Sequence, residues 1–247
     1  GDGTSHDQAI TGAGFQPDWI WHKCRSHANQ HLIVDSVRGS GGSPTQMIHL
    51  ASGDGSAEVN SNSNGAIKSI DSNGLTVTSG NDSSSKSNNA GASGRTYVDW
   101  CWKAGTSFSN DASATGVGSI DSSGSTSTTA GFSIVSYTGT GSVATIAHNL
   151  GAAPSFILIK NRDSNSTDWL VFHQSLGNTK GLYLNTNATQ VTASGFFNDT
   201  SPTSSVFTIG TGGTPNNSGD DYIAYCFAEK QGFSKFGGYT GNSSSDG

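Results

Sequence analysis

The sequence has few charged residues and few apolar ones. Charged residues make up 12% and hydrophobic residues 32% of the 247 positions, against roughly 25% and 45–50% in typical domains. Glutamate occurs only at Glu58 and Glu229, and methionine only once. Disorder driven by charge repulsion needs a high net charge, which is missing here. Because the apolar residues gather in short runs, the composition favours a folded protein with long polar loops.

Clusters of basic residues and long apolar runs are also missing. The 12 Lys and Arg residues are scattered along a chain of net charge −6 and pI near 5.5, whereas nucleic-acid binding needs them clustered. No run approaches the roughly 18 apolar residues of a membrane-spanning helix. We therefore predict neither a nucleic-acid partner nor a membrane partner.

Cysteine is scarce, with three residues in all. A disulfide framework needs a denser and even set. Cys101 and Cys226 occupy the same place in two related aromatic segments, so we interpret both as small buried hydrophobic residues. Cys24 has no such counterpart, since Asn161 stands at the related position.

Glycine (34 residues), Ser, Thr and Asn occupy the remaining positions. Short runs rich in aromatic and β-branched residues alternate with clusters of Gly, Asn, Asp and Ser, which tolerate positive φ and mark turns. No segment shows a sustained helical periodicity. The pattern predicts an all-β protein made of β-sandwiches. Strands are expected at 19–24, 32–34, 47–50, 97–102, 156–159, 169–172, 182–184, 206–209 and 222–227.

One apolar framework occurs twice in the chain, and part of it occurs a third time. FQPDWIWHK (15–23) returns as APSFILIK (153–160), with Pro and Lys at matching places, and YVDWCW (97–102) returns as YIAYCF (222–227). GFS and YTG, found together at 131–139, reappear together at 232–241. Tandem copies of this kind indicate a structural or binding surface rather than a single catalytic pocket.

The repeat divides the chain into four parts. We predict a first β-sandwich module at 1–104, a Ser/Thr/Gly-rich linker at 105–130 and a second module at 131–231. Residues 232–247 then carry either the first strand of a further module or a strand that completes the first module, in the same chain or in a neighbouring one. The chain would accordingly be a cut from a longer repeat array or a unit closed by its own last strand.

No group of residues has a clear catalytic or metal-binding pattern. His22, Cys24, His27 and His31 have the residue types of a zinc site, but not its spacing, and the second copy lacks them. Calcium could use the Asn/Asp-rich loops around 161–168 and 220–221, although turn formation explains the same residues. No nucleophile elbow, phosphate-binding loop or obvious acid–base carboxylate pair occurs. We therefore assign no catalytic, cofactor-binding or metal-ligating residue and predict no cofactor.

Two other sets of repeated or clustered residues have structural interpretations. Lys23 and Lys160 end matching apolar strands, where a cation can extend to solvent or pair with a carboxylate. The tryptophans could stack on sugars, but most lie in strands that we expect in the core, at positions 19, 21, 100, 102 and 169.

Several phrases together resemble a family of repeat-module virion proteins of tailed, mostly marine phages. They are GFSIVSYTGTGS (131–142), HNLGAAPS (148–155), IKNR (159–162), DWLVFHQSLG (168–177), NDTSPTSSVFT (198–208) and residues 222–241. The resemblance covers the second copy and the C-terminal residues closely, and the first copy at 15–25, 35–39 and 97–103. Members look like tail-fibre proteins, which implies two tandem jelly-roll, concanavalin-like sandwich modules.

The resemblance also implies a non-enzymatic protein on the surface of a phage particle. We expect a tail-fibre or surface-appendage component involved in host attachment. Its expected partners are other virion proteins, further copies of itself in a homo-oligomer and a host surface glycan. One alternative is a capsid decoration or assembly protein that binds only other virion subunits. Another is a carbohydrate-active enzyme on a concanavalin-like sandwich, which requires two carboxylates that converge in a groove.

Overall fold

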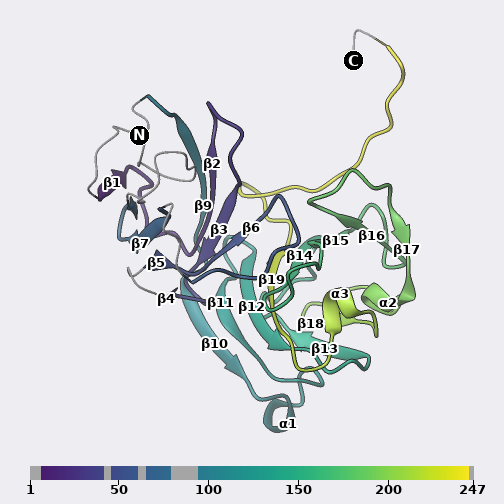
Figure 1. The fold of residues 1–247 in the computed structure, drawn as a ribbon. Coiled ribbons are helices and arrows are strands. Elements are labelled where there is room, and N and C mark those ends of the chain that lie inside the picture. The colour runs from purple at the N-terminus through teal and green to yellow at the C-terminus, as the bar shows by residue number, and fades with distance from the viewer. Residues whose placement is uncertain (1–6, 42–45, 61–64, 79–93, 245–247) are drawn as a thin grey trace.

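The computed structural model describes residues 7–41, 46–60, 65–78 and 94–244. Within these ranges the chain is all-β, with several antiparallel sheets and three one-turn helices (Figure 1). The prediction of an all-β fold is therefore confirmed. No helix in the described ranges is long and apolar enough to cross a membrane.

The N-terminal part of the chain forms two main sheets. A four-stranded sheet has the order β6-β3-β2-β9 and a three-stranded sheet the order β1-β8-β7. A tight turn at residues 72–73 joins β7 to β8. The strands are β1 (Gln8–Thr11), β2 (Trp19–Cys24), β3 (Leu32–Asp35), β6 (His49–Ala51), β7 (Ile67–Asp71), β8 (Gly74–Val77) and β9 (Tyr97–Trp102), with a separate short pair of β4 (Ser40–Gly41) and β5 (Gln46–Met47).

The C-terminal part forms an eight-stranded sheet in the order β10-β11-β12-β19-β14-β15-β16-β17. Its strands are β10 (Thr106–Asn110), β11 (Ser122–Ser127), β12 (Phe132–Thr138), β14 (Phe156–Asn161), β15 (Leu170–His173), β16 (Lys180–Tyr183), β17 (Val191–Thr192) and β19 (Asp221–Phe227). A separate pair joins β13 (Ala144–Ala147) to β18 (Val206–Ile209). The helices are α1 (Ala112–Thr115), α2 (Ser194–Phe197) and α3 (Gly213–Asn216).

Residues 105–130 are not a linker, so this prediction was wrong. They contain β10, α1 and β11, and β11 pairs with β12. Ser107, Ser109 and Ser123 are exposed on these strands. A Ser-rich strand with one exposed face lacks the alternation of large apolar and polar residues that marks a strand in sequence, which is why the composition resembled that of a linker.

The two copies of the repeat pair their strands in the same register. Trp19 of β2 lies opposite Trp102 of β9, and the corresponding Phe156 of β14 lies opposite Phe227 of β19. The next strands along, β3 and β15, also match in register. The order β6-β3-β2-β9 in the first copy therefore corresponds to β16-β15-β14-β19 in the second.

Three apolar cores lie between four layers of sheet, which run from β1-β8-β7 on one side to β13-β18 on the other (Figure 1). The middle core joins the two copies, because residues of the four-stranded sheet pack on residues of the eight-stranded sheet. This middle core contains Trp19, Ile33, Leu50, Ala104, Phe132, Ile134, Leu158, Trp169, Val171, Ile223, Tyr225 and Phe227. Alternate residues of β14 and β19, such as Ile157 and Cys226, face the core beneath β13 and β18.

Trp19 is the centre of an aromatic cluster in this middle core. Its side chain is 2% exposed. Its ring centroid lies 4.7 Å from that of Trp102 and 5.3 Å from that of Tyr225, and Phe132 and Phe227 lie within 6.2 Å. Tilted and edge-on ring contacts at such distances contribute beyond simple burial. The repeated aromatic positions thus hold the two sheets face to face.

His148, in the HNLG phrase, is buried at the end of β13. Its Nε2 lies 3.1 Å from the carbonyl oxygen of Thr203, and its Nδ1 accepts a hydrogen bond from the backbone N–H of Leu150 at 3.2 Å. These partners assign the proton of the neutral ring to Nε2. Burial lowers the pKa of His148 to about 4.

We expect His148 to make the fold less stable in acid. Because its folded pKa of about 4 lies below the ordinary histidine value of 6.5, the unfolded state takes up a proton first as the pH falls. The stability that depends on the neutral His148 ring is fully present above the unfolded pKa. It is lost as the pH falls from there to the folded pKa, and the loss in the free energy of unfolding reaches about 3 kcal/mol. His148→Gln keeps a donor and an acceptor but does not titrate. Urea unfolding at neutral pH and near the folded pKa should show a smaller acid loss in this variant; an equal loss in both proteins would contradict the assignment.

Candidate functional site

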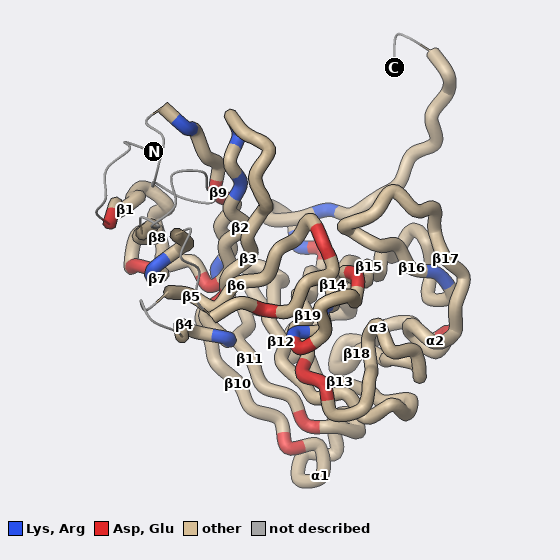
Figure 2. Tube along the Cα trace, viewed as in Figure 1, with Lys and Arg blue, Asp and Glu red and all other residues tan. Residues whose placement is uncertain are grey.

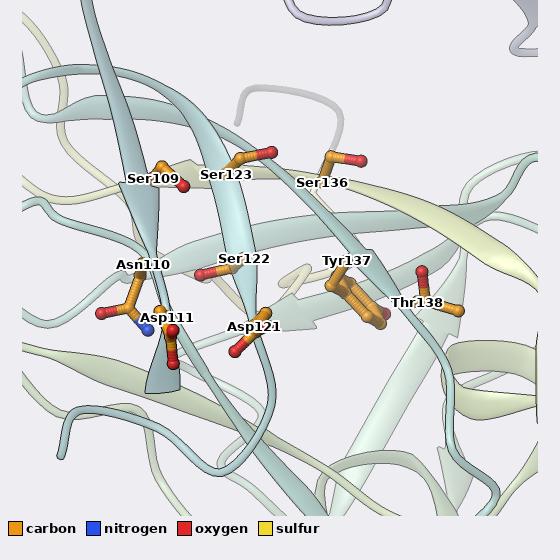
Figure 3. A pocket seen from close by; sticks show the side chains of 9 residues that line it. All are labelled: Ser109, Asn110, Asp111, Asp121, Ser122, Ser123, Ser136, Tyr137 and Thr138. Carbon is orange, nitrogen blue, oxygen red and sulfur yellow. The ribbon is translucent and has the colours of Figure 1, made fainter. Parts of the chain in front are cut away.

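A polar depression of about 290 Å³ lies at one end of the eight-stranded sheet (Figure 3). Strands β10, β11 and β12 and the start of α1 supply its lining. The lining residues are Ser109, Asn110, Asp111, Asp121, Ser122, Ser123, Ser136, Tyr137 and Thr138. The site therefore consists of hydroxyl, amide and carboxylate groups and one aromatic ring.

Three serines form a row across the depression. The strand register places Ser109 opposite Ser123 and Ser123 opposite Ser136, and Figure 3 shows the three side chains in line on adjacent strands. Ser109 and Ser123 are exposed and Ser136 is half-buried. Their hydroxyls make no hydrogen bond to other residues in the described part of the chain. The row thus offers donors and acceptors at the strand spacing of about 4.8 Å.

Other hydroxyls of the lining are already bonded within the protein. Ser122 Oγ donates to the carbonyl oxygen of Ala147 at 3.0 Å, and the Tyr137 hydroxyl donates to that of Pro215 at 2.8 Å. Both residues are buried. They fix the opposite face of the same strands, so the exposed serines stand on a rigid support.

The two carboxylates of the depression belong to the N-terminus of α1. Asp111 Oδ1 accepts hydrogen bonds from the Ala114 backbone N–H at 3.0 Å and from Ser113 Oγ at 2.7 Å, and Asp121 Oδ1 accepts from the Ala112 N–H at 2.9 Å. The hydroxyl of Ser113 lowers the pKa of Asp111. A general acid needs the opposite shift. The arrangement is that of a helix cap, and Figure 2 shows acidic segments near α1.

The structure does not assemble the residues with zinc-ligand types into a site. His22 Nδ1 lies 2.6 Å from Asp99 Oδ1, whereas Cys24 Sγ and His27 Nδ1 both contact Ser26 Oγ. Across the ranges that the structure describes, no three His, Cys, Asp or Glu side chains are grouped so as to hold a metal ion. The positions of these residues are consistent with a strand end followed by a polar turn.

The Asn/Asp-rich loops form turns. Asn161 Oδ1 accepts hydrogen bonds from the backbone N–H groups of Asp163 and Ser164 at 2.9 and 2.8 Å, and its Nδ2 donates to Asp220 Oδ2 at 2.8 Å. Asp163 Oδ2 in turn accepts from the N–H of Asp221 at 2.6 Å. An asparagine that bonds its own following backbone is a common turn device. Asp168 is not part of these turns and accepts a hydrogen bond from Asn185 Nδ2.

The equivalent lysines both end on backbone carbonyl groups. Lys160 is buried, and its Nζ donates to the carbonyl oxygens of Gly55 at 3.1 Å and Asn161 at 2.9 Å. Burial lowers the pKa of Lys160 to about 8. Lys23 Nζ donates to the carbonyl oxygen of Asn29 at 3.1 Å. Burial and the positive charge of Lys23 both lower the pKa of His31. The lysines are structural, but Lys160 reaches a loop of the first copy instead of solvent.

Cysteine and tryptophan are less uniformly buried than we predicted. Cys226 is fully buried, whereas Cys101 is only partly buried, and neither forms a disulfide. Trp19 and Trp169 lie in the core, but Trp100 on β9 is 45% exposed. The two copies therefore differ in how deeply β9 and its counterpart β19 are buried.

A buried charged cluster that we did not predict joins the two sheets. Arg38 Nε lies 2.7 Å from Asp35 Oδ2, and the Tyr225 hydroxyl donates to the same carboxylate oxygen at 2.7 Å. The side chains of Arg38 and Asp35 are both 0% exposed. Burial acts to lower the pKa of Arg38, but the charge and hydrogen bond of Asp35, together with Tyr225 and Glu58, outweigh burial and raise the pKa. Asp35 ends β3 and Arg38 follows it, whereas Tyr225 lies on β19 of the other copy.

A second ion pair extends this link between the copies. Arg162 Nε and Nη2 donate to the two carboxylate oxygens of Glu58 at 2.9 and 2.8 Å. The backbone N–H of Glu58 also donates to the carbonyl oxygen of Arg162 at 2.8 Å, and Trp169 Nε1 donates to that of Ala51 at 2.9 Å. Bidentate pairs of this kind fix orientation as well as distance.

Removal of Arg38 should destabilise the whole fold. Arg38→Met leaves the Asp35 carboxylate buried without its countercharge, which costs about 3–5 kcal/mol. Tyr225→Phe removes the two hydrogen bonds of the hydroxyl, which donates to Asp35 and accepts from Arg38, and should cost about 2 kcal/mol. The urea unfolding midpoint measures both losses. A loss in Arg38→Met no larger than that in Tyr225→Phe would contradict the role of the buried charge.

Comparison with known protein families gives one match, which covers residues 1–247. The matching family model is described as a domain of unknown function (DUF7483). No curated protein and no solved structure matches the sequence. Because the match extends over the whole chain, from the first repeat copy to the C-terminal residues, the protein belongs to the DUF7483 family.

Proposed function

We propose that this protein is a non-enzymatic structural component of a phage virion, located in a tail fibre or another surface appendage that takes part in host attachment. Support comes from the repeated phrases of the sequence and from two strand sets that pair in the same register. We also propose that each set derives from a jelly-roll, concanavalin-like sandwich module. Other virion proteins and further copies of the chain are the proposed assembly partners.

The row of Ser109, Ser123 and Ser136 supports a host surface glycan as the ligand. Sugar hydroxyl groups both donate and accept hydrogen bonds, and so do serine hydroxyls. The three serines are regularly spaced on a sheet whose other face is packed, which favours a fixed binding geometry. Their hydroxyls are not used within the described part of the protein, so a bound glycan would displace only water.

A role in assembly has support of its own from strand β9, one edge of which has no neighbouring strand in the described part of the chain. A carbohydrate-active enzyme has less support. Asp111 and Asp121 line one depression, but both cap α1, and the lowered pKa of Asp111 opposes a role as general acid.

Substitution of the serine row tests glycan binding. Ser123→Val and Ser136→Val remove hydroxyls that we expect to contact sugar, and each should weaken adsorption to permissive cells roughly threefold to tenfold, the effect of one hydrogen bond. Ser40→Val, on exposed β4, is the matched control and should bind like the unmodified protein. Adsorption isotherms of the labelled proteins give the comparison. No adsorption by the unmodified protein, or equal adsorption by all variants, would rule out this site.

The position on the particle can be tested separately by immunogold labelling of intact virions with antibodies against this chain. The proposal predicts label on the tail or its fibres. Label spread evenly over the capsid would identify a decoration protein. The absence of label anywhere on the particle would contradict the assignment to a virion.

A further inference from the structure

Strand β9 has an open edge where its counterpart β19 has a neighbour. In the second copy, β19 lies between β14 and β12. In the first copy, β9 pairs with β2, the counterpart of β14, and no strand in the described ranges pairs with its other edge. Because the two sheets match in order and register, the described part of the first copy has no strand that corresponds to β12.

The exposure of β9 shows the effect of the missing neighbour. From Tyr222 to Phe227, every residue of β19 is buried. No residue of β9 is buried, although the sequences correspond position by position. Trp100 is 45% exposed where Tyr225 is 0% exposed, and Cys101 is partly exposed where Cys226 is fully buried. An apolar, uncovered strand edge is a site for pairing with another strand.

The chain carries a second copy of the strand that fills this place next to β19. β12 begins within the phrase GFSIVSYTG, and the related phrase GFSKFGGYTG stands at 232–241. Gly131 and Gly232, which open the two phrases, share a left-handed backbone with φ of 69° and 86°. Tyr239 is 97% exposed and Phe233 is 64% exposed. Figure 1 shows the last residues leaving the body on the side away from β9.

We propose that residues 232–241 of a second copy of this chain add to the open edge of β9 as an antiparallel strand. This inference concerns assembly and does not depend on glycan binding. Strand addition of this kind draws its affinity from main-chain hydrogen bonds and its specificity from alternate side chains. Each copy has both a donor segment and an acceptor edge, so the contact is head-to-tail and builds rings or filaments.

The pairing of β12 with β19 gives the register. Phe132 lies opposite Phe227 and Tyr137 opposite Tyr222, and the two tyrosine rings stack at 5.1 Å. Phe233 should accordingly lie opposite Trp102, and Tyr239 should pack against Tyr97. The donor phrase has one more residue between these aromatics, which a β-bulge at its Gly-Gly pair accommodates.

Docking has a cost within the donor chain. The Phe236 ring stacks on Phe156 at 5.6 Å and packs on the middle core. Backbone hydrogen bonds also join Ser234 to Lys230, and the backbone of Phe236 bonds the side chains of Gln174 and Glu229. The segment has to give up these contacts before it pairs with β9. We therefore expect exchange between free and docked states to be slow.

Cys101 reports on the edge of β9, because Cys24 and Cys226 are buried. In the full chain, thiol labelling of Cys101 should slow about tenfold or more as association protects the strand, and light scattering should show the mass rising over the same concentrations. Tyr239→Ala removes the anchoring ring from an exposed position and should stay monomeric, with fast labelling throughout. Val143→Ala alters another exposed apolar side chain (47% exposed) and should associate normally.

A synthetic peptide of residues 232–241 provides a second test. Added to the Tyr239→Ala protein, it should protect Cys101, whereas a peptide with Ser in place of Tyr239 should not. If Cys101 of a monomeric protein is protected equally at all protein concentrations, the segment closes the β9 edge of its own chain. That result, or a Cys101 that labels fast under all conditions, would overturn the proposal.

Discussion

The buried contact between Asp35, Arg38 and Tyr225 constrains the arrangement of the whole protein. Two charges without access to solvent are tolerated only when each is neutralised and hydrogen-bonded. The carboxylate belongs to the last residue of β3, the guanidinium follows that strand, and the phenol lies on β19. The four-stranded and eight-stranded sheets must therefore face each other in one register, because a shift between them would separate the Tyr225 hydroxyl from the buried Asp35 carboxylate and Arg38 guanidinium that it bonds.

This arrangement also determines which surfaces remain for binding. The middle of the eight-stranded sheet is covered on both faces, so most residues of β14 and β19 are apolar. At the end formed by β10 and β11, one face is uncovered, and serine replaces the large apolar residues. The depression with the serine row is a consequence of this partial cover, and the open edge of β9 is a second surface that the same architecture leaves free.

The sequence was informative where the repeat was strong. The phrases at 15–23 and 153–160 located β2 and β14, and the YxxxC phrases located β9 and β19, because buried strands need runs of large side chains. β10 and β11 were missed because strands made largely of Ser, Thr and Gly resemble loops in composition. The Asp35–Arg38–Tyr225 contact was also missed, since residues far apart in sequence are brought together only by the packing of two sheets.

Native-state hydrogen exchange of the full chain in increasing, sub-denaturing urea would test most directly whether the two copies form one unit. If the buried contact and the shared core hold the sheets together, the slowest amides of β2 and β3 should open with the same free energy as those of β14 and β19. Amides of β2 and β3 that open at a much lower free energy, while β14 and β19 remain protected, would show two independent units and contradict this account.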